Sequence, residues 1–122
     1  MGNFMELDVW KKAKELAVEI YKLTDNDFFK KDFSLRDQIR RAAISIPSNI
    51  AEGDERLSNK ESVRYFYIAN GSIAELITQL LICKDIGYLN ESEIKVFISE
   101  LEKLSKMLKT LIKYRVNNER KK

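Results

Sequence analysis

A chain of 122 residues, 44% of them hydrophobic, can bury the core of one compact domain and is too short for two domains of ordinary size. Its single proline and four glycines argue against a β-sheet fold, which needs turn residues at short intervals. The net charge of +3 is uneven, because residues 103–122 carry eight basic side chains and one acidic one, whereas residues 1–102 carry 14 and 18. The composition predicts one all-α domain over residues 1–122, with a basic C-terminal end.

A cytoplasmic location is expected. The longest uncharged runs, residues 42–51 and 65–74, have ten residues each, about half of the roughly 20 needed to span a bilayer. The first ten residues lack the basic segment and apolar run of a secretory signal. Cys83 is the only cysteine, so no intrachain disulfide can form. No membrane partner is expected either.

The first predicted helix covers about residues 6–23. Apolar side chains recur there every three or four positions, with lysine and glutamate between them, as in an amphipathic helix. The apolar stripe consists of Val9, Trp10, Ala13, Leu16, Ala17, Ile20 and Leu23. Residues 24–33 contain Asp-Asn-Asp and no periodicity, so they are predicted to be a connector. Its Phe28, Phe29 and Phe33 are expected to fold back over the end of the bundle.

The second predicted helix covers about residues 35–56, and Ser34 is the expected N-cap. Pro47 lies inside it, so the missing N–H should leave the Ala43 carbonyl unpaired and bend the helix. One face is apolar and built partly from small residues. It consists of Leu35, Ile39, Ala42, Ala43, Ile46, Ile50 and Gly53.

The third and fourth predicted helices cover about residues 59–86 and 91–116. Ser58 and Glu61 have the spacing of a capping box, and Asn90 and Glu93 repeat it. Gly87 is the expected residue just beyond the third helix, where a left-handed conformation is common. Four helices of similar length with short connections favour an antiparallel up-down-up-down four-helix bundle.

The third helix is too apolar for a monomer, because Glu75 is the only charged residue between positions 65 and 82. A surface helix normally buries one stripe, so a neighbouring subunit is expected to cover a second one. The residues assigned to this oligomer interface are Tyr65, Ile73, Ile77 and Leu80. Gly71 and Ala42 are predicted to mark the closest approach of the second and third helices.

The residues needed for most catalytic sites are missing. The chain has no histidine, which argues against a di-iron site, a catalytic triad or base chemistry at an imidazole. Neither a phosphate-binding Gly-x-x-x-x-Gly-Lys loop nor a Gly-x-Gly-x-x-Gly pattern occurs. Cys83 is interpreted as a small core residue. We therefore expect no enzyme activity, catalytic residue, metal, cofactor or small-molecule substrate.

A polar line along the second helix has two interpretations. In the first, Arg40, Arg41 and Arg56, together with Gln38 and Asn49, contact the phosphates and bases of a nucleic acid. In the second, which we favour, the side chains form a structural network, since Glu52 lies one turn before Arg56. The residues of that network are Gln38, Arg41, Ser45, Asn49, Glu52, Arg56 and Glu75.

The basic C-terminal end also has two interpretations. The charges could form an ordinary solvated face that stabilises the end of a helix. Alternatively, they could bind nucleic acid, and several copies in an oligomer would add their attraction for phosphate. The residues assigned to nucleic-acid binding are Arg40, Lys103, Lys106, Lys109, Lys113, Arg115 and Arg120.

The segment from Gln38 to Leu76 resembles the 23S rRNA intervening-sequence protein family, also called ribosomal-protein-like four-helix-bundle proteins. Two patterns carry the resemblance, Q-x-R-R-A-x-x-S-I-x-x-N-I-A-E-G-x-x-R and G-S-x-x-E-L. Their residues here are Gln38, Arg40, Arg41, Ala42, Ser45, Ile46, Asn49, Ile50, Ala51, Glu52, Gly53, Arg56, Gly71, Ser72, Glu75 and Leu76.

The resemblance implies a bacterial antiparallel four-helix bundle that assembles as a fivefold ring and whose function is largely unknown. The family is similar to the accessory protein of diversity-generating retroelements, a more basic pentamer that binds nucleic acid and a reverse transcriptase. Two hypotheses follow. The first is a non-enzymatic homopentamer that binds RNA, DNA or a nucleic-acid enzyme through its basic end. The second is a protein-interaction scaffold that binds no nucleic acid.

Overall fold

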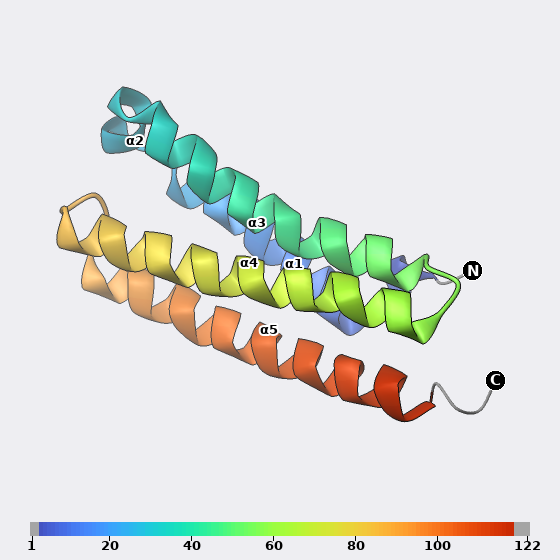
Figure 1. Cartoon of the computed structure of the whole chain (residues 1–122). Helices are drawn as coiled ribbons and strands as arrows, with labels where there is room; N and C mark the ends of the chain where they lie inside the picture. Colours follow the sequence, from blue (N-terminus) through green and yellow to red (C-terminus); the bar gives the residue numbers. More distant parts are fainter. Residues whose placement is uncertain (1–2, 119–122) are drawn as a thin grey trace.

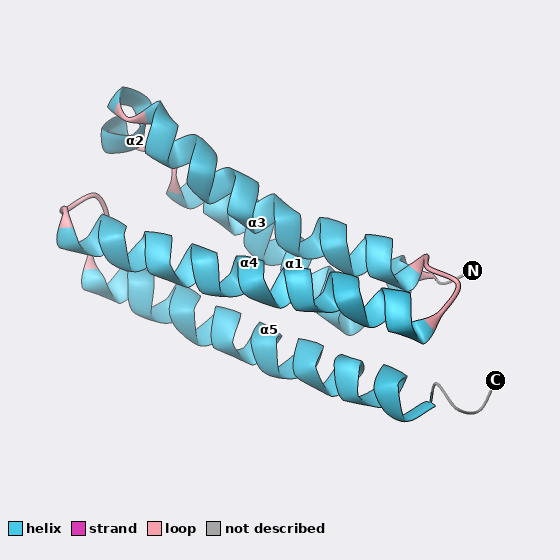
Figure 2. Cartoon of the chain, viewed as in Figure 1, coloured by secondary structure: helices cyan, strands magenta, loops and turns pink. Residues whose placement is uncertain are grey.

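The computed structural model describes residues 3–118, and every regular element within them is helical (Figures 1 and 2). This confirms the predicted all-α class. The elements are the 3-10 helix η1 (Phe4–Glu6) and the α-helices α1 (Asp8–Leu23), α2 (Asp27–Lys31), α3 (Phe33–Asp54), α4 (Asn59–Asp85) and α5 (Glu91–Asn118).

The four long helices form a bundle-like arrangement in which α3 and α4 make the most extensive contact (Figure 1). Helix α4 also packs against α5, and α1 packs against α3. The short helix α2 lies at the end of the bundle where α3 begins (Figure 1). The opposite end holds the turn between α3 and α4, the start of α1 and the end of α5, so residues far apart in sequence meet there.

Both predicted capping sequences act as helix caps. The Ser58 hydroxyl accepts a hydrogen bond from the Glu61 N–H (3.2 Å) at the start of α4. At the start of α5, the Asn90 side chain accepts from the Glu93 N–H (2.9 Å), and the Glu93 carboxylate accepts from the Asn90 N–H (3.1 Å). Gly87 has a φ of +84°, which suits glycine in the turn after α4. Local side-chain chemistry therefore fixes both helix starts.

Two predictions for residues 24–34 were wrong, the connector without regular structure and the cap at Ser34. These residues include the one-and-a-half-turn helix α2, capped by Asn26, and Asp32 rather than Ser34 caps α3 by accepting from the Leu35 N–H (3.3 Å). Phe29 is fully buried, but Phe28 and Phe33 are 54% and 60% exposed. A five-residue helix is too short to show periodicity, and Asp32 can cap α3 because it lies three residues before Leu35.

Helix α3 continues through Pro47, which is buried. One turn of it is supported by Asn49, whose amide donates to both the carbonyl oxygen (2.8 Å) and the hydroxyl (2.9 Å) of Ser45. The largest side chains buried in the core come from α1 to α5. They are Phe29, Phe66, Ile20, Ile39, Ile46, Ile50, Ile73, Leu76, Leu80, Ile94, Leu101 and Leu104.

Helix α4 buries a different face from the one expected. Two residues assigned to an oligomer interface, Ile73 and Leu80, are only 2% and 0% exposed, so the chain's own core already covers them. Ile77 is partly buried against the same core, and Tyr65 is half-buried. The large apolar residues of α4 that are exposed are Tyr67, Ile68, Leu81 and Ile82. When nearly every position of a helix is apolar, periodicity cannot identify the inward face.

By length and composition, α4 is also the one described helix that could cross a membrane. The most apolar window of 18 residues has a mean hydropathy of 1.4, and 44% of that window is buried inside the bundle. Phe66, Leu76 and Leu80 in this helix are fully buried. Part of this helix therefore belongs to the core of the bundle.

The close approach of α3 and α4 occurs at Gly53 rather than Gly71. A Cβ atom built on Gly53 would lie 2.6 Å from the Phe66 ring and 2.9 Å from the Ser62 carbonyl oxygen, whereas one built on Gly71 would meet nothing within 4 Å. The predicted contact of Ala42 with Gly71 was therefore wrong. Ser45 of α3 and Ser72 of α4 do meet, with their hydroxyl oxygens 2.9 Å apart.

Candidate nucleic-acid interface

Arg115, one of the predicted nucleic-acid-binding residues, is part of the fold. Its guanidinium donates to the Asp54 carboxylate (2.6 Å) and lies 5.3 Å from the centre of the Phe66 ring. The Asp54 side chain is only 5% exposed and that of Arg115 only 17%. Gly53, Asp54, Ser62, Phe66 and Arg115 together are called the turn cluster, because they join α3, α4 and α5 near the α3–α4 turn. Because both side chains are largely buried, the ion pair between Asp54 and Arg115 serves the packing of the helices rather than the binding of nucleic acid.

Arg40 and Lys103 also bind groups within the chain. The Arg40 guanidinium donates to the Thr24 hydroxyl (2.9 Å) and the Tyr21 carbonyl oxygen (3.2 Å), and it stacks 4.5 Å over the Tyr21 ring. Lys103 pairs with Glu100 (3.0 Å), which also accepts from Lys12 (2.9 Å). Hydrogen bonds from Lys12 and Lys103 lower the pKa of the Glu100 carboxyl. Both cationic groups are therefore already paired within the chain.

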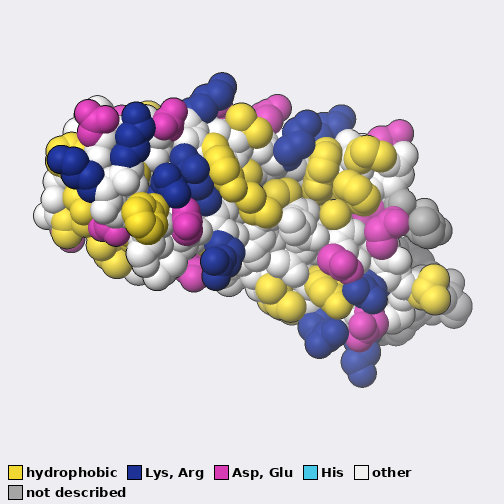
Figure 3. Space-filling model, turned by 90° about the horizontal axis from the view of Figure 1, so that it is seen from above, with side chains coloured by type: hydrophobic (Ala, Val, Ile, Leu, Met, Phe, Trp, Pro, Cys, Tyr) yellow, Lys and Arg dark blue, Asp and Glu magenta, His cyan; other side chains and the backbone are white. Residues whose placement is uncertain are grey.

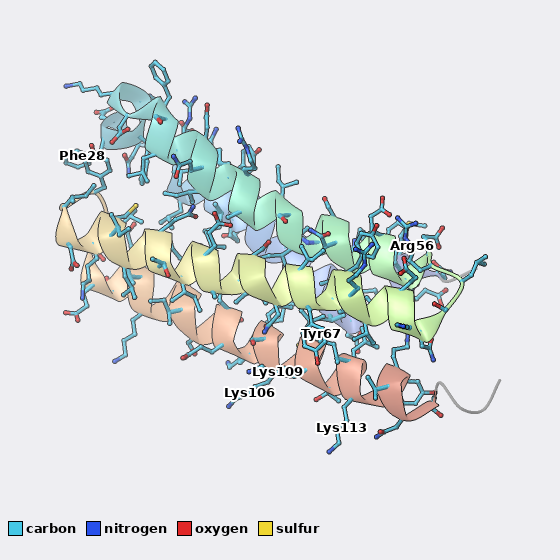
Figure 4. All side chains as sticks on the ribbon, in the orientation of Figure 1. Phe28, Arg56, Tyr67, Lys106, Lys109 and Lys113 are labelled. Carbon is cyan, nitrogen blue, oxygen red and sulfur yellow. The ribbon has the colours of Figure 1, made fainter. Side chains whose placement is uncertain are left out.

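The remaining predicted residues on α5 are different. Lys106, Lys109 and Lys113, called the lysine row, are exposed, and no described residue makes a hydrogen bond or ion pair with their ammonium groups. Figure 4 shows them projecting outward from α5. With a rise of about 1.5 Å per residue, the row extends about 10 Å along the helix. Arg120 lies outside the described residues.

A groove between α4 and α5 runs beside the lysine row. Asn70 and Ser105 are hydrogen-bonded across it (2.7 Å), and farther along, the Asn59 amide donates to the Arg115 carbonyl oxygen (3.1 Å). Ala74 and Ile77 line the apolar side of the groove, and Glu102, Lys106 and Lys109 line its charged side. The groove therefore combines hydrogen-bonding groups, apolar surface and two unpaired ammonium groups.

Comparison with known proteins assigns the chain to a family. A family model described as 23S rRNA-intervening sequence protein matches residues 5–110. The chain belongs to this family. It is also similar to the 1.70 Å crystal structure of a protein of unknown function from the S23 ribosomal protein family of Bacteroides thetaiotaomicron, with 27% identity and a TM-score of 0.78, covering 86% of this chain and 98% of that one. No curated protein matches.

The polar line that carried the resemblance to the 23S rRNA intervening-sequence proteins is only partly a network. Arg56 donates to Glu52 (2.5 Å) and to the Tyr65 hydroxyl (2.9 Å), and Asn49 donates to Ser45. The other three predicted members are exposed and have no hydrogen-bond partner among residues 3–118. They are Gln38, Arg41 and Glu75. The structural interpretation therefore accounts for four of the seven residues.

Cys83 is fully buried, as expected for a core residue of this family member. Burial, with a smaller contribution from Asp32, raises the pKa of the Cys83 thiol to about 11. The reactive thiolate is therefore scarce at neutral pH. Within the part of the chain that is described, no three His, Cys, Asp or Glu side chains gather as a metal-binding group.

Sequence reasoning missed the turn cluster and Tyr67. Gly53 and Phe66 lie on different helices, and no pattern within one helix reveals that a glycine faces a phenylalanine. Asp54 and Arg115 are 61 positions apart, so their pairing leaves no i,i+4 signal. Tyr67 is 60% exposed on α4, inside a run of apolar residues that obscured its position.

Proposed function

We propose that this chain is a non-enzymatic, cytoplasmic nucleic-acid-binding protein that acts as a ring of antiparallel up-down-up-down four-helix bundles. The lysine row is the observation that carries the nucleic-acid part of the proposal. It offers three ammonium groups that the fold does not use, and backbone phosphates are the usual partners of such a row. The description of the matching family, 23S rRNA-intervening sequence protein, is consistent with a role near RNA.

Contacts between helices support the antiparallel arrangement. The Ser62 hydroxyl donates to the Gly53 carbonyl oxygen, and Ser72 meets Ser45, so residue numbers rise along α4 as they fall along α3. The Asn70–Ser105 and Asn59–Arg115 hydrogen bonds have the same sense for α4 and α5. Short connections between long helices favour this topology.

Exposed apolar residues support the ring. Ile68 and Ile82 are each 46% exposed, and Ile44 of α3 is 43% exposed. Ile68 and Ile82 are 14 residues apart, which places them along one line of α4, on the side where Ser72 meets α3. Figure 3 shows hydrophobic side chains gathered between basic ones on the face of the molecule seen from above. Covering such a band is a common reason for subunit association.

A ring also strengthens the attraction for nucleic acid. Each phosphate neutralised on a duplex contributes a slope of about −0.9 to the dependence of log affinity on log salt concentration. Three lysines on one chain give weak binding, but repeated copies of the lysine row around a ring would act on the same nucleic acid. The implied pentamer would present five rows.

Light scattering and fluorescence anisotropy test the proposal together. We expect a mass five times the 14.3 kDa of one chain, and binding to labelled RNA or duplex DNA that weakens as salt rises. A variant with Lys106→Gln, Lys109→Gln and Lys113→Gln should keep the mass and lose most of the binding. A monomer would refute the ring, and a wild-type protein that binds no nucleic acid would refute the function.

A protein-interaction scaffold is the second candidate, favoured by the exposed apolar face of α4. In that case the charges of α5 keep the protein soluble, and the apolar band binds a protein, for example an enzyme that acts on nucleic acid. A salt-independent oligomer without affinity for RNA or DNA would favour this alternative.

A further inference from the structure

We propose that the face formed by α4 and α5 binds single-stranded nucleic acid, with Tyr67 stacking on one unpaired base while the lysine row contacts the neighbouring phosphates. This inference rests on the proposed function and specifies its ligand class. Proteins that bind single strands without sequence preference combine aromatic rings for base stacking with a positively charged groove along the backbone.

Tyr67 lies beside the groove on the same side as the lysine row. It is three residues before Asn70 on α4, and Lys109 is four residues after Ser105 on α5. Because α4 and α5 are paired through Asn70–Ser105 and Asn59–Arg115, Tyr67 and Lys109 are each about one turn from the first pair, toward the second. Figure 4 shows Tyr67 between the two helices, with the lysine row beyond it.

The ring of Tyr67 is available, unlike those of most exposed aromatic residues. Phe28 stacks on Tyr88 with ring centres 5.3 Å apart, and Arg40 covers Tyr21 at 4.5 Å. Arg36 lies 6.0 Å from the Phe33 ring. Among residues 3–118, Tyr67 has no aromatic or cation partner although it is 60% exposed. A base could therefore stack on it without displacing a contact of the fold.

Tyr114 is the other exposed aromatic residue without a ring partner in the described chain, and it is 62% exposed. It is nine residues after Ser105, which at about 100° per residue turns it half-way around α5 from the side that meets α4. It therefore faces away from the groove. Tyr114 provides a matched control, being the same side chain with nearly the same exposure.

A single strand fits this face better than a duplex. Bases in a duplex are stacked on one another, so a tyrosine beside a row of lysines could reach only the backbone. An unpaired base can leave the strand and cover the ring, next to the Asn70 and Ser105 side chains. Glu102 at the far end of the groove repels phosphate, which places the strand near Lys109 and Lys113.

Anisotropy titrations with labelled oligonucleotides of about 16 nucleotides, the upper end of known site sizes, test the inference. The probes are single-stranded RNA, the same sequence as single-stranded DNA, and the blunt duplex. We expect Tyr67→Ser to weaken both single-strand affinities by about five- to tenfold, the lower part of the range for base stacking, and to leave the duplex affinity unchanged. Tyr67→Phe and Tyr114→Ser should behave as the wild type.

The outcomes separate the two levels of the proposal. A Tyr67→Ser variant that binds single strands as well as the wild type overturns the stacking role while the proposed function stands. The stacking role is also overturned if Tyr114→Ser lowers the single-strand affinity as much as Tyr67→Ser does. The same holds if Tyr67→Ser lowers the duplex affinity as much as the single-strand affinity. Absence of wild-type binding to all three probes overturns the proposed function itself. Since Tyr67 is largely exposed, circular dichroism should show an unchanged fold in each variant.

Discussion

Arg115 and Lys113 are two cations on the same helix, only two residues apart, yet the molecule uses them in opposite ways. Arg115 is partly buried in the turn cluster, where its charge is matched by the buried Asp54 and its guanidinium lies over Phe66. Lys113 belongs to the lysine row and has no partner within the described chain. The sequence alone therefore overstates the basic surface of α5. Its charge assigns Arg115 to binding, but Arg115 is paired with Asp54 on the buried side of the helix.

Breaking the buried pair should have the largest effect. Arg115→Met leaves the Asp54 carboxylate buried without its cation, and loss of one partner of a buried pair typically costs about 3–5 kcal/mol. The matched variant Lys113→Met removes an exposed charge and should change the free energy of unfolding by less than about 0.5 kcal/mol. Urea denaturation followed by circular dichroism measures both. Equal effects of the two substitutions would contradict the contrast.

Filling the close approach in the turn cluster should have the next largest effect. Gly53→Ala would place a methyl group 2.6 Å from the buried Phe66 ring and 2.9 Å from the Ser62 backbone oxygen. Overpacking of this kind costs about 1–3 kcal/mol, more than the gain in helix propensity returns. The melting temperature should therefore fall. An unchanged or raised melting temperature would show that α3 and α4 do not meet closely at this position.

Gly71→Ala should have a smaller effect of the opposite sign. Nothing in the chain lies within 4 Å of the added methyl group, and replacing an exposed helical glycine gains about 1 kcal/mol. The melting temperature should rise, whereas it would fall if the close approach that the sequence predicted at Gly71 existed. The variant could instead melt below the wild type at high protein concentration, with that difference disappearing on dilution. Such a result would mean that a second copy packs against Gly71.

Much of the fold could be predicted from local chemistry. Short-range signals such as the Ser58 cap, the Asn90 and Glu93 capping box and Gly87 were enough to place the ends of α4 and the start of α5. Helix α2 was not predicted, because a helix of five residues is too short to show a periodic pattern. The inward face of α4 could not be predicted either, since a run that is apolar all round fits several orientations equally well.

The candidate site was harder to predict for a related reason. The sequence shows which side chains are cations but not which of them find a carboxylate or a carbonyl oxygen from a distant segment. Arg40 meets Thr24 and Arg115 meets Asp54 only after the helices have packed. Glu100, which binds Lys12 as well as Lys103, shows the same long-range matching. Of the residues that the sequence assigned to nucleic-acid binding, the lysine row is what remains unpaired within residues 3–118.

The lysine row is proposed to bind backbone phosphates, and the salt dependence of binding measures its contribution. For a single strand, each contacted phosphate contributes about 0.7 to the slope of log affinity against log salt. Removing all three lysines should reduce the steepness of that slope by about 2 for each participating chain, with an unchanged melting temperature. A triple variant that keeps the wild-type slope would show that nucleic acid binds elsewhere and that the lysine row is an ordinary solvated face.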